Sequence, residues 1–510
     1  MSTVAMNRVC HLIVLLVVVG TGCREDPSER DPPRVPDFDP TTGCEGRLDP
    51  VEPHGEVHTV GTGNRASCTE EALHEAVEAL NAGGGGTLLF DCGGEHEIVL
   101  TESVRITADA VVDGGHEITL SGGGAVRVIE LDHHLNFVLQ RITIREGFVA
   151  AGSDNESGAG LLHPWFGTLE VIDATFVDNH SASQENDVGG GAIYAGGLTH
   201  AVLSGTTFVS NTGSIGGAVL SRSTNLRVVD TAFYDNAATS WAESGQYGNG
   251  GGLYIDRLWL DDPVDFVICG AHFEGNRATV HGSAFFSYNL EGTGALFDRC
   301  TFVDNHMDGP GGGTGTVYHQ GVPLVFTHST VAQNSTGHHA GGLFLGGGTD
   351  ATIANSTFVG NETPGNAGAI WAGNGRVSIR HTTIARNHAD FGPAIFRGAD
   401  GEVTLTATIL AENTTDNEFS ALSCHATFGD GGGNFQWPDV RPNGNPDTPC
   451  AESITFADVR LGDLDDHGGF SPTLALPPDS PAAGVVEDCP AFDQRGEPRE
   501  VPCTAGAFEP

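Results

Sequence analysis

The chain contains a repeated pattern that ends in an asparagine, and acidic side chains recur at the position directly before that asparagine. Two or three carboxylates on neighbouring turns of a stacked structure could act as acid and base in sugar hydrolysis, and calcium-binding acids beside an arginine could support elimination. No two acids fall in adjacent repeats, so we predict no catalytic residues. The residues at this place are Asp178, Ser210, Asp235, Gly275, Asp304, Gln333, Gly360, Arg386 and Glu412.

Two further acidic groups could bind calcium through carboxylate oxygens. They are Asp261, Asp262 and Asp265, and Asp463, Asp465 and Asp466. The formal net charge is −43, and in so acidic a chain such runs are usually solvated surface. The same charge argues against nucleic acid as a partner, because nucleic acid needs a basic surface. The sequence thus predicts no metal site and no cofactor, with Ca²⁺ the one ion left open.

A column of aromatic side chains suggests a third kind of chemistry, the contact of rings with sugars or with a partner. Strands that follow glycines, such as GGLYI 251–255 and AGAIW 367–371, carry an aliphatic residue and then a mostly aromatic one. Side chains alternate faces along a strand, so one of these two columns points outward. Both columns are apolar, and the sequence leaves open which one is exposed. The possible ligand-binding stripe comprises Tyr194, Tyr254, Phe286, Tyr318, Phe344, Trp371 and Phe396.

The elements that must position these side chains are short repeats, each with two apolar strands and an asparagine three residues after a Phe, Val, Ile or Leu. Repeats of 25 to 40 residues with almost no helical periodicity predict a solenoid, and short strands favour a right-handed parallel β-helix. Asparagine tolerates a left-handed turn, and identical side chains on stacked turns can form a hydrogen-bonded ladder. We predict that the asparagines are structural. The ladder comprises Asn179, Asn211, Asn236, Asn276, Asn305, Asn334, Asn361, Asn387 and Asn413.

A single helix is expected at the start of the repeats. Ser67 and Glu70 form a capping-box pair, and Leu73, Ala76, Val77 and Leu80 make one apolar face before NAGGGG ends the helix. An amphipathic helix over the first turn would cover its strand edge. We therefore expect an all-β chain whose N-terminal end is closed by this helix.

The N-terminal sequence predicts export. An apolar run of eight residues, Leu12 to Val19, is too short to span a bilayer and indicates a signal peptide over 1–22. The small residues before Cys23 resemble a bacterial lipoprotein box, which implies lipid attachment at Cys23 and, with Arg24 after it, an outer-membrane address. Residues 23–50 are rich in proline and charge and predict a disordered tether.

The remaining cysteines suit an oxidising compartment. Eight of them fall into couples that are close in sequence, which we predict to be disulfides and which leave Cys44 unpaired. Cys269 and Cys300 differ by two residues in register, so their bond would require a local bulge. The disulfide candidates are Cys68 with Cys92, Cys269 with Cys300, Cys424 with Cys450, and Cys489 with Cys503.

Two stretches carry a family resemblance. The F-x-x-N and GG-A-I pieces resemble the polymorphic outer membrane protein repeat of surface-displayed β-helix proteins. The ending HGGFSPTLALPPDSPAAG…DQRGEPR…CTAGAFEP resembles a choice-of-anchor C-terminal domain of bacterial surface proteins. The resemblance implies a pectin-lyase-like solenoid over 51–415, a loop-rich insertion over 416–459 and a small disulfide-stapled module over 460–510.

Together these features predict a lipid-anchored, monomeric, cell-surface β-helix with a structural or adhesive role that binds a glycan or another surface. The alternative is a polysaccharide lyase or glycoside hydrolase, since enzymes of both kinds use the same fold and fold alone does not decide function.

Overall fold

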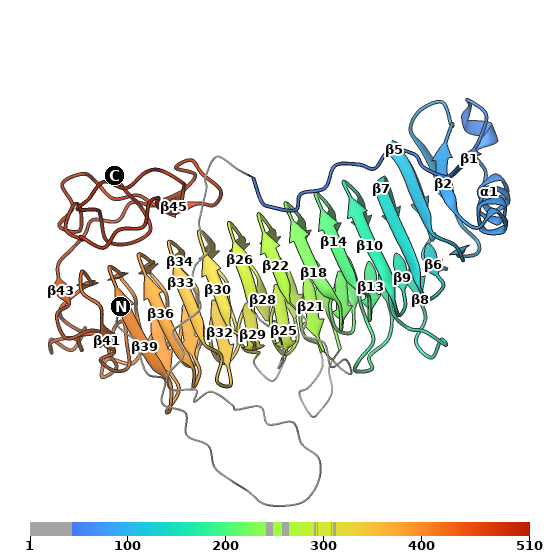
Figure 1. Ribbon diagram of the computed structural model, residues 1–510. Helices are drawn as coiled ribbons and strands as arrows, with labels where there is room; N and C mark the ends of the chain where they lie inside the picture. The colour runs from blue at the N-terminus through green and yellow to red at the C-terminus, as the bar shows by residue number, and fades with distance from the viewer. Residues whose placement is uncertain are drawn as a thin grey trace, which may run out of the picture.

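The computed structural model describes residues 43–510 apart from 241–247, 258–264, 290–291, 293, 308 and 310–312. The chain is a parallel β-helix, and the predicted fold is confirmed (Figure 1). Neighbouring turns pair in parallel and in register, so equivalent residues of successive turns stack in columns along the rod. Calcium candidates Asp261 and Asp262 lie outside the described residues, as does Cys23.

Three parallel sheets form the sides of the rod. One 11-stranded sheet, here called the ladder sheet, contains the glycine-led strands β4 (Val104–Ile106), β6 (Ile129–Leu131), β9 (Leu161–His163), β13 (Ile193–Gly196), β17 (Val219–Arg222), β21 (Leu253–Asp256), β25 (Phe285–Asn289), β29 (Val317–Gly321), β32 (Leu343–Gly346), β35 (Ile370–Ala372) and β38 (Ile395–Arg397). A narrow six-stranded sheet contains β8 (Phe148–Val149), β12 (His180–Ser181), β16 (Thr212–Gly213), β20 (Ala237–Ala238), β24 (Arg277–Ala278) and β28 (His306–Met307).

The third sheet is bent along its length, so most turns contribute one strand to a first leg and one to a second leg. The first leg contains β1 (Glu56–Val60), β2 (Gly86–Phe90), β10 (Gly167–Ile172), β14 (His200–Ser204), β18 (Asn225–Val229), β22 (Phe266–Cys269), β26 (Ala295–Asp298), β30 (Leu324–Thr327), β33 (Ala351–Ala354), β36 (Arg376–Arg380), β39 (Glu402–Thr406) and β41 (Gly429–Asp430). The second leg contains β3 (His96–Val99), β11 (Thr175–Val177), β15 (Thr207–Val209), β19 (Ala232–Tyr234), β23 (His272–Glu274), β27 (Thr301–Val303), β31 (Thr330–Ala332), β34 (Thr357–Val359), β37 (Thr383–Ala385), β40 (Ile409–Ala411), β42 (Phe435–Trp437) and β43 (Thr455–Phe456). The long strands β5 (Ala110–Ser121) and β7 (Leu135–Arg145) run through both legs.

The asparagines form a continuous ladder between the second leg and the narrow sheet. The backbone N–H and the side-chain amide of each asparagine donate to the side-chain oxygen of the next, as from Asn276 to Asn305 at 2.9 Å. The same amide also donates to a backbone carbonyl one turn back, as from Asn276 to Phe233 at 2.8 Å. All nine asparagines are buried, and the phenylalanines three residues earlier stack inside the rod. The ladder therefore closes every turn from Asn179 to Asn413.

A second buried column runs along the inside of the bend. Its members are small, and their hydroxyls or thiol bond to carbonyls of the bend, as from Thr231 Oγ1 to the Leu203 carbonyl at 3.2 Å. Position by position it consists of Ala174, Thr206, Thr231, Ala271, Cys300, Ser329, Ser356, Thr382 and Thr408. Cys300 thus takes the place of a serine, and burial raises the pKa of its thiol to about 12.

This column explains why one predicted disulfide is wrong. Cys269 precedes the bend and is in register with Asp298, whereas Cys300 follows the bend one turn later. Gly270 directly follows Cys269, and its positive φ of 65° turns the chain at the bend. Residues before the bend at the register of Cys269 therefore face outward, whereas Cys300, the counterpart of Ala271 in the next turn, faces the core. Cys269 bonds to Cys44 instead, and Cys300 is free. The structure pairs Cys68 with Cys92, Cys424 with Cys450, and Cys489 with Cys503.

The N-terminal end is covered by α1 (Glu70–Gly83), which follows a 3-10 turn, η2 (Arg65–Ser67). The apolar face packs on the core through Leu73, Val77 and Leu80. The predicted capping box is wrong in its residues, because Thr69 is the N-cap and its hydroxyl accepts from the Ala72 N–H at 3.1 Å. Ser67 instead bonds within the preceding turn.

Residues 43–55 form a strap along the outside of the bend, which the predicted tether of 23–50 did not anticipate. The strap contacts successive turns from the N-terminal end toward the middle of the rod (Figure 1). Its contacts are His54 with Thr87, Val51 with Gln140, Arg47 with Asp173, Leu48 with Ser204, Glu45 with Arg227, and Cys44 with Cys269. The predicted tether is therefore wrong for residues 43–50, which the rod itself binds.

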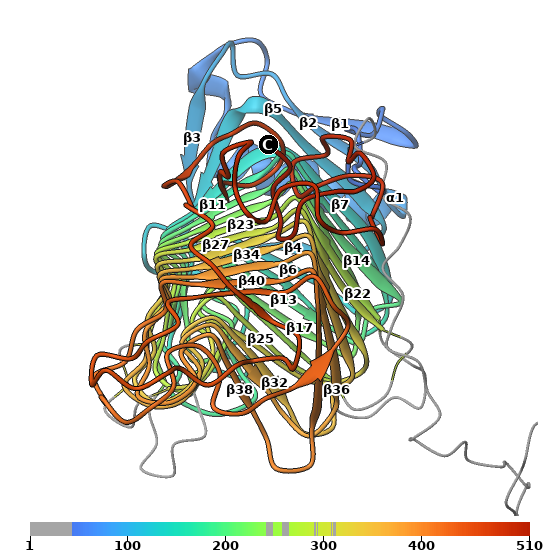
Figure 2. The same ribbon diagram turned by 90° about the vertical axis from the view of Figure 1, so that its left-hand side faces the viewer.

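The C-terminal part divides differently from the prediction. Residues 416–459 are not an insertion, because β41, β42 and β43 extend both legs of the bent sheet. The module that follows contains only the short antiparallel pair β44 (Leu464–Asp465) and β45 (Thr473–Leu474) and folds back over the second leg (Figure 2). An apolar cluster joins the two, with Ala332, Val359 and Ile409 from the rod and Leu474, Leu476 and Phe508 from the module.

We expect His381 to make docking of the module sensitive to acid. Its ring is buried at the bend and bonds through Nε2 to the Asp488 carbonyl at 2.9 Å, with Arg380 and Arg499 beside it. Burial, together with the charges of Arg499 and Arg380, lowers the pKa of His381 to about 4. The unfolded chain therefore takes up the proton first as pH falls below about 6.5.

We expect stability to be full above about pH 6.5 and to be lost progressively down to about pH 4, by roughly 3 kcal/mol from this one group. Chemical denaturation at a series of pH values measures the loss. His381→Gln keeps an N–H donor without a titrating group, so its denaturation midpoint should fall less in this window. Identical pH profiles for the two proteins would exclude His381 as a source of the acid sensitivity.

Candidate functional site: the outer aromatic ladder

The aromatic column of the ladder sheet points outward, which settles the phase that the sequence left open. The aliphatic residue before each member, such as Ile193, Leu253 or Ile370, is fully buried in the main core. The aromatic residues pair in register from strand to strand and form a separate stack on the outer face. We call its half-exposed part, Tyr318, Phe344, Trp371 and Phe396, the outer aromatic ladder.

Not all of the predicted stripe is accessible. Tyr194, Tyr254 and Phe286 are less than 10% exposed and pack with Leu162, Ile215 and Leu220 in an apolar cluster. The segment before β13 is tied over this end by Arg222, which donates to the Asp187 carbonyl at 2.8 Å. The stripe therefore has a buried N-terminal part and an open C-terminal part.

Ring geometry limits what the outer aromatic ladder can bind. Consecutive rings are nearly parallel, with centroids 4.7 Å apart for Tyr318 and Phe344, 5.7 Å for Phe344 and Trp371, and 4.7 Å for Trp371 and Phe396. Each ring face is thus covered by the ring of the next turn, and a ligand outside the rod meets ring edges. A sugar cannot stack face to face on these rings, but it can lie across their edges.

Polar groups lie beside this row of ring edges. His281 stacks on Tyr318 at 5.0 Å and His425 on Phe396 at 4.2 Å, and His339 lies tilted against Trp371 at 5.0 Å. Burial lowers the pKa of His281 to about 4 and also lowers the pKa values of His339 and His425. At neutral pH these imidazoles are therefore uncharged, and in His339 and His425 Nδ1 accepts from the backbone N–H of Asn366 and Arg397, which leaves Nε2–H as the donor.

Glycines flank the outer aromatic ladder on its other side. Two residues after Phe344, Trp371 and Phe396 come Gly346, Gly373 and Gly398, where alternation places a residue on the same face. In the preceding turn the same position is Gln320, whose side-chain oxygen accepts from the Tyr318 hydroxyl at 3.0 Å. Gly346 and Gly373 are buried, because the Gln320 side chain lies against Gly346 and the backbone of Leu345 and Gly347 lies against Gly373, so these glycines allow neighbouring turns to pack closely.

The N-terminal end of the same face carries a buried charged group that sequence reasoning missed. Asp256 accepts from Arg222 Nε at 3.2 Å and from the Tyr254 hydroxyl at 3.2 Å, and burial raises its pKa despite Arg222. Arg222 also pairs with Asp187 at 3.0 Å. The only signal in the sequence is position, because Arg222 and Asp256 each stand two residues after the stripe column.

The acids that precede the ladder asparagines do not converge. All nine residues at this position have positive φ, from the Asp178 turn to the Glu412 turn, which explains why Asp and Gly recur there. Most are exposed on the outside of the rod, and Arg386 and Glu412 pair with each other at 2.6 Å. The recurrence that suggested chemistry is therefore a feature of turn geometry.

The second calcium candidate is also dispersed. Asp463 is fully exposed, and the carboxylates of Asp465 and Asp466 accept from nearby backbone N–H groups of the same loop. In the first group, Asp265 accepts from the Gly294 N–H at 3.0 Å. Within the described ranges, no group of three or more His, Cys, Asp or Glu side chains is placed to hold a metal ion.

Comparison with known proteins adds no identification. No protein-family model matches the chain. No curated protein matches it either. The described part of the chain has no helix long and apolar enough to span a membrane. The outer aromatic ladder thus rests on its own geometry as the candidate site.

Proposed function

We propose that this protein is a cell-surface β-helix lipoprotein with a structural and adhesive role, attached through lipid on Cys23 and acting as a monomer. The outer aromatic ladder carries the proposal as the surface that contacts a glycan or another surface. It offers four partly exposed rings, flanked by uncharged imidazoles, in one line along the rod.

The position of the ladder on the rod supports this role. In Figure 2 the C-terminal module lies above β34 and β40, while β32 and β38 of the ladder sheet lie at the opposite, lower edge. The strap and the module occupy the bend, so residues 43–55 and the C-terminal module lie away from the ladder sheet. A protein tethered from the bend would present the ladder sheet outward. Four disulfides suit the oxidising space outside the cytoplasm.

The alternative is a polysaccharide lyase or glycoside hydrolase. Asp256 favours it, because a buried carboxyl with a raised pKa on the ladder face has the protonation chemistry of a general acid. Arg222 and Tyr254 both bond to that carboxyl, which leaves it poorly placed to reach a substrate. We therefore keep adhesion as the proposed function and expect Asp256→Asn to leave ligand binding unchanged.

Replacing two rings of the outer aromatic ladder tests the proposal. In Tyr318→Ser/Trp371→Ser we expect binding to the recognised glycan or surface to weaken at least tenfold, which corresponds to about 1.4 kcal/mol. The loss of unfolding free energy should be about 1–2 kcal/mol per ring, because both rings are only partly buried. Binding by surface plasmon resonance and denaturation of the same samples separate the two effects.

Tyr254→Ser is the matched control, because Tyr254 belongs to the same column but is 7% exposed. It should lose more stability, about 3 kcal/mol or more, with unchanged affinity. If the double variant also kept its affinity, the outer aromatic ladder would be a packing feature and the binding surface would lie elsewhere.

A further inference from the structure

The strap joins turns that a solenoid otherwise connects only through their neighbours. Three of its contacts, Gln140, Ser204 and Cys269, lie one after another on a single outward column of the first leg, which also includes Val229. Arg47 is the most connected residue of the strap, with Asp173 at 2.6 Å and Ser204 Oγ at 3.0 Å. Under the strap this column is buried although it faces away from the core.

The last contact of the strap is covalent. Cys44 and Cys269 are separated by 225 residues, and their sulfurs pack with Val229, whose side chain is fully buried. This bond encloses the strap, α1 and every turn up to β22. In a repeat fold each turn is stabilised mainly by its neighbours, so tension at a free end would detach turns in sequence. Because of the Cys44–Cys269 bond, a pull on residue 44 acts instead on Cys269 in β22.

We infer that the strap and its disulfide form a tension latch, which passes a pull on the N-terminal segment directly to β22 in the middle of the rod. The turns from β1 to β18, with the helix cap, then carry no tension. Without the bond, the same pull peels the strap from Asp230, Ser204 and Gln140 and then acts on α1 and the first turns. The inference concerns force on residue 44 and holds whether or not Cys23 carries lipid.

Single-molecule force spectroscopy on the full chain, with handles at the two ends, tests the latch. We compare the oxidised protein with Cys44→Ala/Cys269→Ala, which removes both thiols and prevents new pairing with Cys300. The variant should first yield at a lower force than the oxidised protein, with release of the strap and then of N-terminal turns. Its total extension should be longer by about 201 residues, which is the 225 that Cys44–Cys269 encloses less the 24 that Cys68–Cys92 still closes, or about 70 nm at roughly 3.5 Å per residue.

The matched control removes another N-terminal disulfide, in Cys68→Ala/Cys92→Ala. That bond lies inside the segment that Cys44 and Cys269 enclose, so the force of the first event and the total extension should stay as in the oxidised protein. Reduction of the folded wild-type protein during the pull provides the latch-open state if the variant folds poorly. A first event at the same force in latched and unlatched proteins would overturn the inference.

Discussion

Asn276→Ala is expected to destabilise the protein by about 4 kcal/mol or more, because it breaks the asparagine ladder in the middle of the rod. The Asn276 amide donates to the Phe233 carbonyl and to Asn305 Oδ1, and its oxygen accepts from both N–H groups of Asn236. The Asn236 backbone N–H loses its acceptor, and the Phe233 carbonyl, the Asn236 amide and Asn305 Oδ1 each lose one hydrogen bond in a region without solvent, at about 1–3 kcal/mol for an unsatisfied group. Thermal or chemical denaturation measures the total.

Hydrogen exchange adds a local test of this prediction. Stability in a repeat fold is roughly a sum over turns and their interfaces, so exchange should quicken first in the turns of Asn236 and Asn305. Asn136→Ala is the control, because that asparagine lies exposed on β7 and its loss should cost under about 1 kcal/mol. A cost at Asn276 no larger than at Asn136 would contradict a structural role for the ladder.

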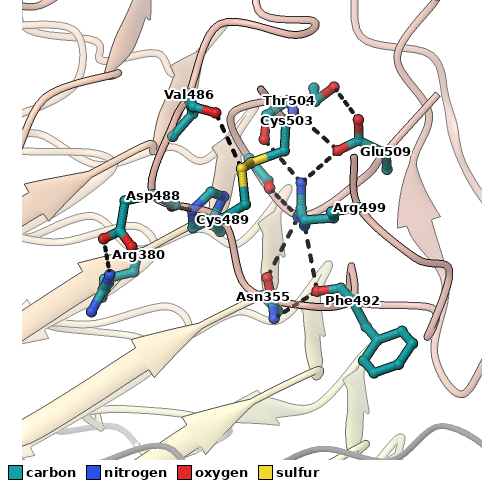
Figure 3. Close-up of a disulfide and its surroundings, with 12 residues drawn as sticks. Asn355, Arg380, Val486, Asp488, Cys489, Phe492, Arg499, Cys503, Thr504 and Glu509 are labelled. Atoms are coloured by element: carbon teal, nitrogen blue, oxygen red, sulfur yellow. Dashed lines mark hydrogen bonds and ion pairs between the residues drawn. A yellow bond between two sulfur atoms is a disulfide. The ribbon is translucent and has the colours of Figure 1, made fainter. Parts of the chain in front are cut away.

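Arg499→Leu is expected to release the C-terminal module from the rod. The Arg499 guanidinium is fully buried and donates to Glu509 at 3.0 Å, to the carbonyls of Thr504 and Gly506 at 2.9 and 2.7 Å, and weakly to Asn355 of the rod at 3.5 Å (Figure 3). Leucine leaves Glu509 charged and poorly solvated. Breaking a buried ion pair from one side costs about 3–5 kcal/mol.

Loss of the module should uncover the apolar cluster of Ala332, Val359 and Ile409 on the second leg. Hydrogen exchange should then quicken in residues 464–510 and in β31, β34 and β37, while the N-terminal turns stay protected. Arg460→Ala provides the comparison within the same module, since Arg460 pairs with Asp479 at the surface and should cost about 0–1 kcal/mol. Unchanged protection in Arg499→Leu would mean that other contacts hold the module.

Gln494 of the module also forms hydrogen bonds to the rod. Its amide donates to Thr330 Oγ1 and Ser471 Oγ at 2.8 Å, and its oxygen accepts from Thr357 Oγ1 at 2.7 Å. Gln494 and Arg499 belong to the DQRGEPR stretch that suggested an anchor-associated domain. In this chain both side chains are used inside the protein, and they fasten the module to its own rod.

The solenoid fold could be predicted from the sequence because the same residue types recur once in each turn. The spacing of Phe358 and Asn361 and its counterparts specified a solenoid, because identical side chains in identical positions can only be accommodated by stacking. The phase of the aromatic column could not be derived, because Leu253 and Tyr254 are both apolar and either could face the core. Exposure then depended on what covers each turn, as the burial of Tyr254 and the partial exposure of Trp371 show.

Contacts between distant segments were beyond sequence reasoning. Cys44 pairs across 225 residues with Cys269, and no local pattern in the tether indicates that the bend binds it. The short sequence separation of Cys269 and Cys300 favoured a disulfide between them, but the two residues lie on opposite sides of the bend. The signal that could have identified Cys300 is its position two residues before Phe302, where other repeats carry Thr206, Ser356 or a comparably small residue.

The proposed function is adhesion without catalysis, and a single experiment tests both parts of it. The chain from Arg24 onward is incubated with a panel of acidic and neutral polysaccharides, with and without calcium, while binding, new reducing ends and unsaturated uronate absorbance are followed together. We expect saturable binding to at least one polysaccharide, with no new reducing ends and no change in uronate absorbance. Cleavage of any polysaccharide, or no binding to any of them, would contradict it.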